Sequence, residues 1–122
     1  MAITELVKLT RLAKPLTSDE GQRILERDRF TCQYCGLDGM RFFENSLIMT
    51  VDFVVPRSLK GKKNPDNLVT ACRPCNVLKG NRRVFPSFEA AKEHVLKRRA
   101  ALRKEWESRV VRVAGSVPAS WP

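Results

Sequence analysis

The clearest indication of chemistry in this chain comes from its four cysteines. They form two C-x-x-C pairs, Cys32 with Cys35 and Cys72 with Cys75. Both thiolates of such a turn can point at one ion, and two turns together can complete a tetrahedron around it. Gly36 follows the first pair and permits a tight turn there. We therefore predict a structural Zn²⁺ site with these four ligands. A closed site of this kind has no open position for a substrate, so catalysis would need a second ion.

Three other interpretations of the cysteines stay open at this stage. Iron can occupy the same four-thiolate shell. A redox-active C-x-x-C is disfavoured, because no βαβ pattern surrounds either pair. The two pairs can also be unrelated thiols packed in a core.

The charge balance indicates a polyanionic partner. The chain has 122 residues, with 23 Lys and Arg against 13 Asp and Glu, for a formal net charge of +10. Basic side chains that neutralise phosphates release counterions, which favours binding. A solvated basic surface and an anionic membrane are the alternatives. We expect a nucleic acid, with DNA as the first choice and RNA as the second.

The same chain gives no indication of a membrane or of secretion. It has no apolar run of about 18 residues, the length needed to span a bilayer. Its first 16 residues lack both a long apolar block and a small-residue cleavage site. We therefore expect no membrane partner and a cytoplasmic, reducing location, where thiols more often bind metals than form disulfides.

The elements that must position the cysteines are only partly clear from local patterns. Thr17 and Glu20 fit a capping box for a helix that ends near Asp28. We further expect a strand over 5–12 and a hairpin in which 40–44 pairs with 47–55. A basic loop should follow over 57–67, and then a strand over 68–70. One helix should run from the second cysteine pair towards Gly80, and another over 87–109. The length favours one folding unit. We divide it into an N-terminal extension (1–26), a zinc domain (27–84), a basic C-terminal helix (85–110) and a flexible tail (111–122).

Several segments around and between the cysteine pairs resemble one known family. They are RDRFTCQYCG, VDFVVPRS, DNLV and ACRPCNVLKGNR, in this order. From about Arg27 to Arg83 the chain is similar to the HNH endonucleases, in their four-cysteine zinc-binding form. The resemblance implies an α+β fold, a small zinc-stabilised ββα-metal domain, here with flanking N-terminal and C-terminal helices. It also implies metal-dependent cleavage of phosphodiester bonds in DNA, occasionally in RNA.

The resemblance also implies roles for four residues. Asp52 and Asn76 occupy the positions that hold a catalytic divalent ion, for which oxygen ligands favour Mg²⁺ or Mn²⁺. Asn67 matches the asparagine that fixes the active-site loop through its side-chain amide. Phe53 stands where the family has the histidine that activates water.

Phe53 raises the question whether the chain can cut at all. A phenyl ring cannot accept a proton, and loss of a general base typically costs about 10² to 10⁴-fold in rate. His94, Glu44 or direct loss of a proton from metal-bound water to solvent are the possible substitutes. The alternation of Val51, Phe53 and Val55 suggests instead that these three side chains share one buried face.

The basic residues near the motif are candidates for contact with the phosphate backbone. They are Arg57, Lys60, Lys62, Lys63, Lys79, Arg82 and Arg83. The basic helix over 87–109 is a weaker candidate. Aromatic residues do not interleave with these charges in a stacking pattern, so we expect recognition by shape and charge with weak sequence preference.

The leading hypothesis is an HNH-family nucleic-acid-binding protein whose cleavage activity is lost or greatly slowed. One alternative is an active endonuclease that uses another base or solvent. The other is a non-enzymatic zinc module that binds nucleic acid or docks on a protein.

Overall fold

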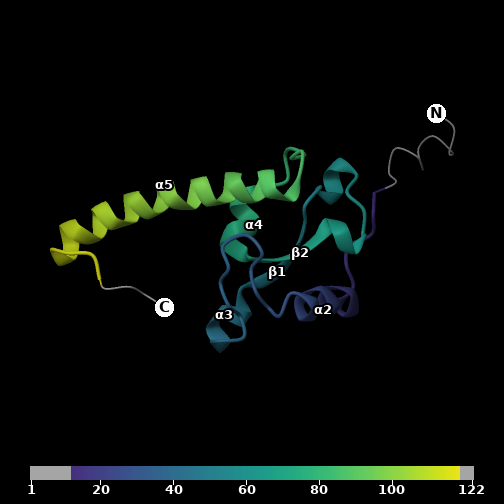
Figure 1. Ribbon diagram of the computed structural model, residues 1–122, viewed down its shortest axis with the longest axis horizontal. Coiled ribbons are helices and arrows are strands. Elements are labelled where there is room, and N and C mark those ends of the chain that lie inside the picture. Colours follow the sequence, from purple (N-terminus) through teal and green to yellow (C-terminus); the bar gives the residue numbers. More distant parts are fainter. Residues whose placement is uncertain (1–11, 119–122) are drawn as a thin grey trace, which may run out of the picture.

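A computed structural model describes residues 12–118 of the chain (Figure 1). Its centre is a two-stranded antiparallel sheet followed directly by a helix. The elements, in chain order, are α2 (Ser18–Arg27), α3 (Phe43–Leu47), β1 (Met49–Phe53), the 3₁₀ turns η1 (Arg57–Leu59) and η2 (Pro65–Asn67), β2 (Leu68–Cys72), α4 (Arg73–Lys79) and α5 (Phe88–Ala114). The predicted class is confirmed: this is a small α+β fold of the ββα type with helices on either side.

Helix α2 begins where the sequence predicts it. The Thr17 hydroxyl accepts a hydrogen bond from the Glu20 backbone N–H, and the Glu20 carboxylate accepts one from the Thr17 N–H. This reciprocal capping satisfies two donors that a helix start leaves free. At the other end, the Arg27 guanidinium donates to the backbone carbonyls of Pro65 and Leu68. The helix is thereby tied to the start of β2.

The cap of α2 also carries an ion pair that depends on pH. Lys63 Nζ lies 2.9 and 3.0 Å from the two carboxylate oxygens of Glu20. The hydrogen bond from Lys63, followed by those from Thr17, lowers the pKa of Glu20 from 4.5 to about 2. Because the folded pKa is depressed, the stabilisation is present above the unfolded value and is lost as the pH falls towards 2.

We therefore expect Glu20→Gln to lower the thermal unfolding midpoint at pH 7 and to lower it less at about pH 4, just below the unfolded value of 4.5. Circular dichroism melts at several pH values would measure the difference between the two proteins. Glu44→Gln, at an exposed position on α3, is the matched control. An effect of Glu20→Gln that is the same at both pH values would contradict this account.

The predicted hairpin of 40–44 with 47–55 is wrong. Residues 39–41 form a turn and α3 follows, because the Asp38 carboxylate accepts a hydrogen bond from the Met40 N–H and the Asp38 carbonyl accepts one from the Asn45 side chain. Strand β1 pairs instead with β2, in a register that sets Met49 opposite Cys72. The predicted strand over 68–70 is correct and extends to Cys72.

The ends of the chain differ from the prediction in one respect. Helix α5 continues to Ala114, so residues 111–114 are not part of a tail. Gly115 ends the helix with a φ of 81°, a left-handed conformation that glycine adopts without a steric penalty. Of the strand predicted over 5–12, residues 5–11 lie outside the described residues, and Leu12 is not in a strand.

The hydrophobic core is small and rich in sulfur. Its buried cluster comprises Cys32, Tyr34, Ala71, Cys72, Cys75, Phe85, Ala91 and Val95. Three of these eight residues are cysteines of the two pairs, so the packing centre and the thiol cluster coincide. In the described part of the chain, no helix combines the length and the apolar character needed to cross a membrane.

Candidate metal centre and adjacent pocket

The fold brings all four cysteine sulfurs together. Each sulfur lies within 4.8 Å of the other three, and the Sγ atoms of Cys35 and Cys72 are 3.8 Å apart. All four thiols are free. A tetrahedral Zn²⁺ with Zn–S bonds of about 2.3 Å has sulfur–sulfur edges of about 3.8 Å. The four donors therefore fit one tetrahedral ion, and the arrangement is that of a structural metal site.

Two different local structures present the thiols. In the first pair, Cys32 N–H donates to the Leu37 carbonyl, and the Cys35 N–H points at the Cys32 sulfur at 3.4 Å. Gly36, at φ 79°, closes this turn. In the second pair, Cys72 ends β2 and Cys75 lies in the first turn of α4. The metal site thus joins the first turn to the junction of strand and helix.

Without a cation, the four thiols differ in how readily they ionise. Hydrogen bonds with Cys35, Cys72 and Cys75 lower the pKa of Cys32. The pKa of Cys35 is also lowered, because the hydrogen bond with Cys32, which raises it, is outweighed by those with Cys72 and Cys75. Sharing of hydrogen bonds with Cys32, followed by Cys35, raises the pKa of Cys72 and of Cys75. Some of the cluster therefore stays protonated. A bound divalent cation reverses this preference, since it stabilises thiolates directly.

Helix α5 adds a positive charge to the sulfur cluster. The Arg99 guanidinium lies 3.7 Å from the Cys75 sulfur. Burial lowers and the charges of Cys35 and Cys75 raise the pKa of Arg99, with a net rise. Four thiolates around a divalent ion carry a net charge of −2, which this guanidinium partly offsets.

We expect Arg99→Leu to weaken binding of Zn²⁺ by about 10- to 100-fold, the usual cost of losing a hydrogen-bond partner of a metal ligand. Competition with a chromophoric chelator would measure the affinity. Arg98→Leu is the matched control, because Arg98 is exposed on the same helix. Equal affinities for the two variants would show that Arg99 does not act on the site.

A second candidate site is a pocket of about 470 Å³ between β1 and α4. We call it the β1–α4 pocket. It is lined by Leu12, Pro15, Leu16, Val51, Asp52, Phe53, Pro56, Arg57, Ser58, Asn76, Lys79 and Asn81. Three positions that the resemblance singles out, Asp52, Phe53 and Asn76, therefore lie around one cavity.

Both carboxylate oxygens of Asp52 are already engaged. The Tyr34 hydroxyl donates to Oδ2 at 2.6 Å, and Lys79 Nζ lies 3.2 Å from Oδ1. Only 5% of the Asp52 side chain and 1% of the Lys79 side chain are exposed. The Lys79 ammonium also donates to the backbone carbonyls of Phe53 and Gly80. This group is a closed, buried polar network.

Burial and the two hydrogen-bonding partners change the pKa of Asp52 in opposite directions. Burial raises the pKa of Asp52, while the Lys79 charge and the Tyr34 hydrogen bond lower it, with a net rise. Burial, followed by the Asp52 charge, raises the pKa of Tyr34 well above its usual range. The phenol therefore stays protonated and acts as a donor.

The two asparagines have different surroundings. The Asn76 side-chain amide donates to the Thr50 hydroxyl at 3.0 Å, on the same strand as Asp52. The Asn67 side chain accepts from the Val55 N–H and donates to the carbonyls of Val55 and Lys62. Asn67 thereby holds the two ends of the basic loop together.

The residues present do not fit a divalent ion between Asp52 and Asn76. An ion at Asp52 needs the carboxylate oxygens that Tyr34 and Lys79 engage, and it would sit beside the Lys79 ammonium. Over residues 12–118, the four cysteines are the sole cluster of three or more cysteine, histidine or acidic ligands. A lysine side chain thus supplies the positive charge that the resemblance assigns to a metal ion.

Neither of the two side chains considered as substitute bases lines this pocket. His94 lies on α5, where its Nδ1 is 2.8 Å from the Arg83 guanidinium and its ring packs on Phe85. Glu44 is exposed on α3. The expected burial of Val51, Phe53 and Val55 is also wrong: they are half-buried, whereas Asp52 and Val54 are buried. The side of β1 that carries Asp52 faces Tyr34 and Lys79, so the polar network takes the place of apolar packing.

The predicted phosphate contacts differ in accessibility. Lys60, Lys62 and Arg82 are exposed. Arg57 is half-buried, lines the β1–α4 pocket and donates to the Ala13 carbonyl. Lys63 pairs with Glu20. Arg83 is exposed and stacks on Phe85, while Lys79 is buried in the Asp52 network.

The sequence signal that would have placed Lys79 inside is its spacing from Cys75. The two residues are four positions apart on α4, and residues at that spacing share one face of a helix. Cys75 must point inward to bind the ion, so Lys79 must lie on the inner face as well. For Tyr34, inside the first C-x-x-C turn, we find no comparable signal.

Comparison with known protein families supports the resemblance over part of the chain. Residues 32–82 match the family model described as HNH endonuclease. The matched segment contains both cysteine pairs, β1, β2 and α4. It makes up less than half of the chain. Searches of curated proteins and of solved structures found no significant match.

Proposed function

We propose that this protein is an HNH-type module that binds nucleic acid, DNA in the first place, and does not cut it at an appreciable rate. The observation that carries the proposal is the Asp52 carboxylate, which is held by Tyr34 and Lys79 at the position where an endonuclease needs a metal ligand. Phe53 at the position of the general base supports the same conclusion. We assign Zn²⁺ to the four cysteines and an architectural role to Asn67 in the basic loop.

The proposed binding surface consists of exposed and half-buried basic residues near the β1–α4 pocket. Lys60 and Lys62 lie in the loop that Asn67 closes, and Arg82 and Arg83 follow α4. Arg57 lines the pocket between them. Lys63 stays in the proposed surface as a weaker contributor, since its ion pair with Glu20 has to be shared. We leave Lys79 out, because its ammonium is buried. The zinc domain over 27–84 and a cytoplasmic location remain part of the proposal.

Binding is tested by fluorescence anisotropy with duplex DNA over a range of salt concentrations. We expect the logarithm of the affinity to fall linearly with the logarithm of the salt concentration, by about 0.9 per phosphate contact. The triple variant Lys60→Ala, Lys62→Ala, Arg82→Ala should reduce this slope by about one unit for each phosphate that is no longer neutralised. Arg41→Ala, at an exposed basic residue between the cysteine pairs, is the control. Affinity that hardly changes with salt would refute the charge-based surface.

Cleavage is tested separately, by nicking of supercoiled plasmid with Mg²⁺ or Mn²⁺. We expect no nicking by the wild-type protein. We also expect none by Phe53→His, because restoring an imidazole does not free Asp52 from Lys79. Nicking by the wild-type protein would establish the active endonuclease instead. Nicking by Phe53→His alone would show that Asp52 and Asn76 still bind an ion.

A further inference from the structure

The junction of α4 and α5 forms a groove that is distinct from the β1–α4 pocket. We call it the α4–α5 groove; its volume is about 730 Å³. Its apolar lining comes from Ile48, Pro74, Val77, Leu78, Leu102 and Trp106. Val77 is 72% exposed, and Leu102 and Trp106 are 46% and 45% exposed. Large apolar side chains gathered around one hollow are typical of a protein-binding surface.

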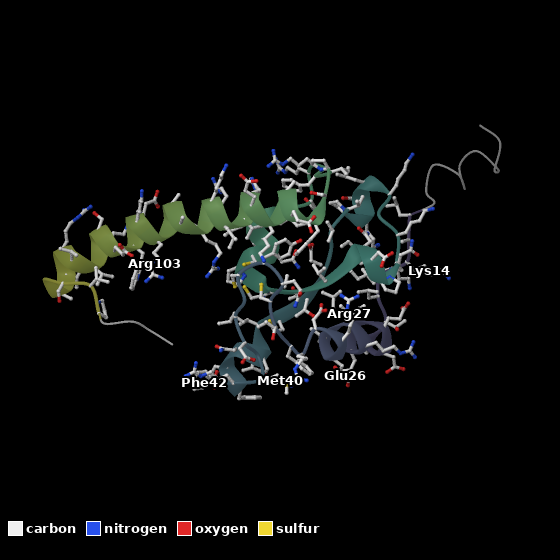
Figure 2. All side chains as sticks on the ribbon, viewed as in Figure 1. Lys14, Glu26, Arg27, Met40, Phe42 and Arg103 are labelled. Atoms are coloured by element: carbon white, nitrogen blue, oxygen red, sulfur yellow. The ribbon has the colours of Figure 1, made fainter. Side chains whose placement is uncertain are left out.

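The C-terminal half of helix α5 has no buried residue. Figure 1 shows that α5 runs along the body above α4 and then continues beyond it. Its buried residues are Ala91 and Val95, both in the first third of the helix. Figure 2 shows Arg103 on the half that extends away from the body. No residue of α5 beyond Val95 is buried, so a partner along this half would cover apolar side chains that the chain leaves exposed.

The charges around the groove select the kind of partner. Arg73, Arg99 and Arg103 line it, and among the described residues no carboxylate does. The distal part of α5 also carries Lys104, Arg109 and Arg112 against Glu105 and Glu107. Glu107 pairs with Arg103 at 2.9 Å, but the stretch keeps an excess of positive charge. A second copy of the chain would bring an equally basic helix and would be repelled. An acidic partner would be attracted.

The apolar floor favours a protein over a nucleic acid. Valine, leucine and isoleucine side chains offer nothing to a phosphate, whereas they suit the apolar face of an amphipathic helix lying in a groove. The groove is also independent of the proposed nucleic-acid site. Asn76 lines the β1–α4 pocket, and the next residue, Val77, lines the α4–α5 groove. Successive residues of a helix point about 100° apart, so α4 separates the two surfaces.

We infer that the α4–α5 groove binds an acidic amphipathic helix of another protein. The apolar side chains of that helix pack between Val77 and Trp106. Its carboxylates face Arg73, and also Arg103, where they compete with Glu107. This binding leaves the nucleic-acid surface uncovered and stands independently of the proposed nucleic-acid function.

The test uses the full chain loaded with Zn²⁺ and a phage-displayed library of random 16-residue peptides. We expect the selected peptides to be acidic and to carry apolar residues at i, i+3 or i+4, and i+7. The best peptide, made synthetically, should lose at least about tenfold in affinity to Val77→Asp and to Trp106→Ala, a loss of about 1.4 kcal/mol. Val113→Asp, at a 90% exposed position on α5 outside the groove, should leave the affinity unchanged.

Zinc content and circular dichroism verify that each variant is folded. If Val77→Asp does not fold, Trp106→Ala alone tests the groove. Failure to enrich any peptide, or enrichment of peptides that are not acidic, would overturn the inference. So would peptide binding that survives both groove substitutions. Loss of DNA affinity in Trp106→Ala would make the groove a nucleic-acid surface. Self-association that the same substitution abolishes, measured by sedimentation, would make the occupant a second copy.

Discussion

Serine in place of Cys75 is expected to unfold the ββα unit. The substitution removes one of four ligands and leaves the metal without a closed shell. Structural Zn²⁺ sites contribute an apparent binding free energy of about 10–16 kcal/mol at pH 7, which is more than a small domain has in reserve. The buried cluster contains three of the four cysteines, so no separate apolar core remains to hold β2 against α4.

The measurement is a pair of observations on each protein: zinc per chain by elemental analysis, and the near-ultraviolet circular dichroism, to which buried Tyr34 contributes. The wild-type protein should show one ion per chain and a cooperative melt, and a strong chelator should abolish both. Met40→Ala, at a 60% exposed position between the cysteine pairs, should behave as the wild type. If Cys75→Ser retains a cooperative melt within a few degrees of the wild type, the fold does not depend on the ion.

Replacing Lys79 by methionine is expected to cost about 3–5 kcal/mol of stability. The substitution keeps an unbranched side chain that is one atom shorter, but leaves the Asp52 carboxylate buried without its counter-charge. It also removes the donor to the Phe53 and Gly80 carbonyls. Unfolding by urea, analysed for the free energy in water, would measure the loss.

The double variant Lys79→Met, Asp52→Asn should be more stable than Lys79→Met alone, because it removes the unpaired charge. Lys97→Met is the matched surface control. Lys97 pairs with Glu93 at 3.0 Å, but both side chains are well exposed, and such pairs contribute about 0–1 kcal/mol. Equal costs for the buried and the surface lysine would mean that the Asp52–Lys79 pair is not part of the folded state.

Local patterns predicted the parts of the fold that depend on neighbouring residues. The Thr17–Glu20 cap and the two cysteine turns are defined within four residues each. The pairing of β1 depends on a contact with β2 about 20 residues further along, which the β-forming residues at 40–44 obscured. Propensity favours a strand there, whereas the Asp38 turn and the metal site require a different path.

For the candidate site, the sequence predicted which residues come together but not which hydrogen bonds and ion pairs they form. The order of the motifs brought Asp52, Phe53 and Asn76 to one cavity. The sequence did not reveal that Tyr34 and Lys79 engage the Asp52 carboxylate, since Tyr34 comes from a different turn 18 residues away. Whether a carboxylate meets a metal ion or an ammonium is decided by such distant contacts.

The three hydrogen bonds of Asn67 close the segment from Val55 to Lys62 into a loop whose two ends are held at fixed positions. Gly61 is part of its base, because a Cβ there would collide with the Val55 carbonyl oxygen. Between these anchors the tip residues Ser58, Leu59 and Lys60 are exposed and belong to neither strand, so substitutions there are expected to leave the pairing of β1 and β2 unchanged. The charge of this tip, which carries Lys60, could therefore be changed by design. Such a change would alter the attraction of the tip for an anionic partner while the cysteine cluster and the sheet stay the same.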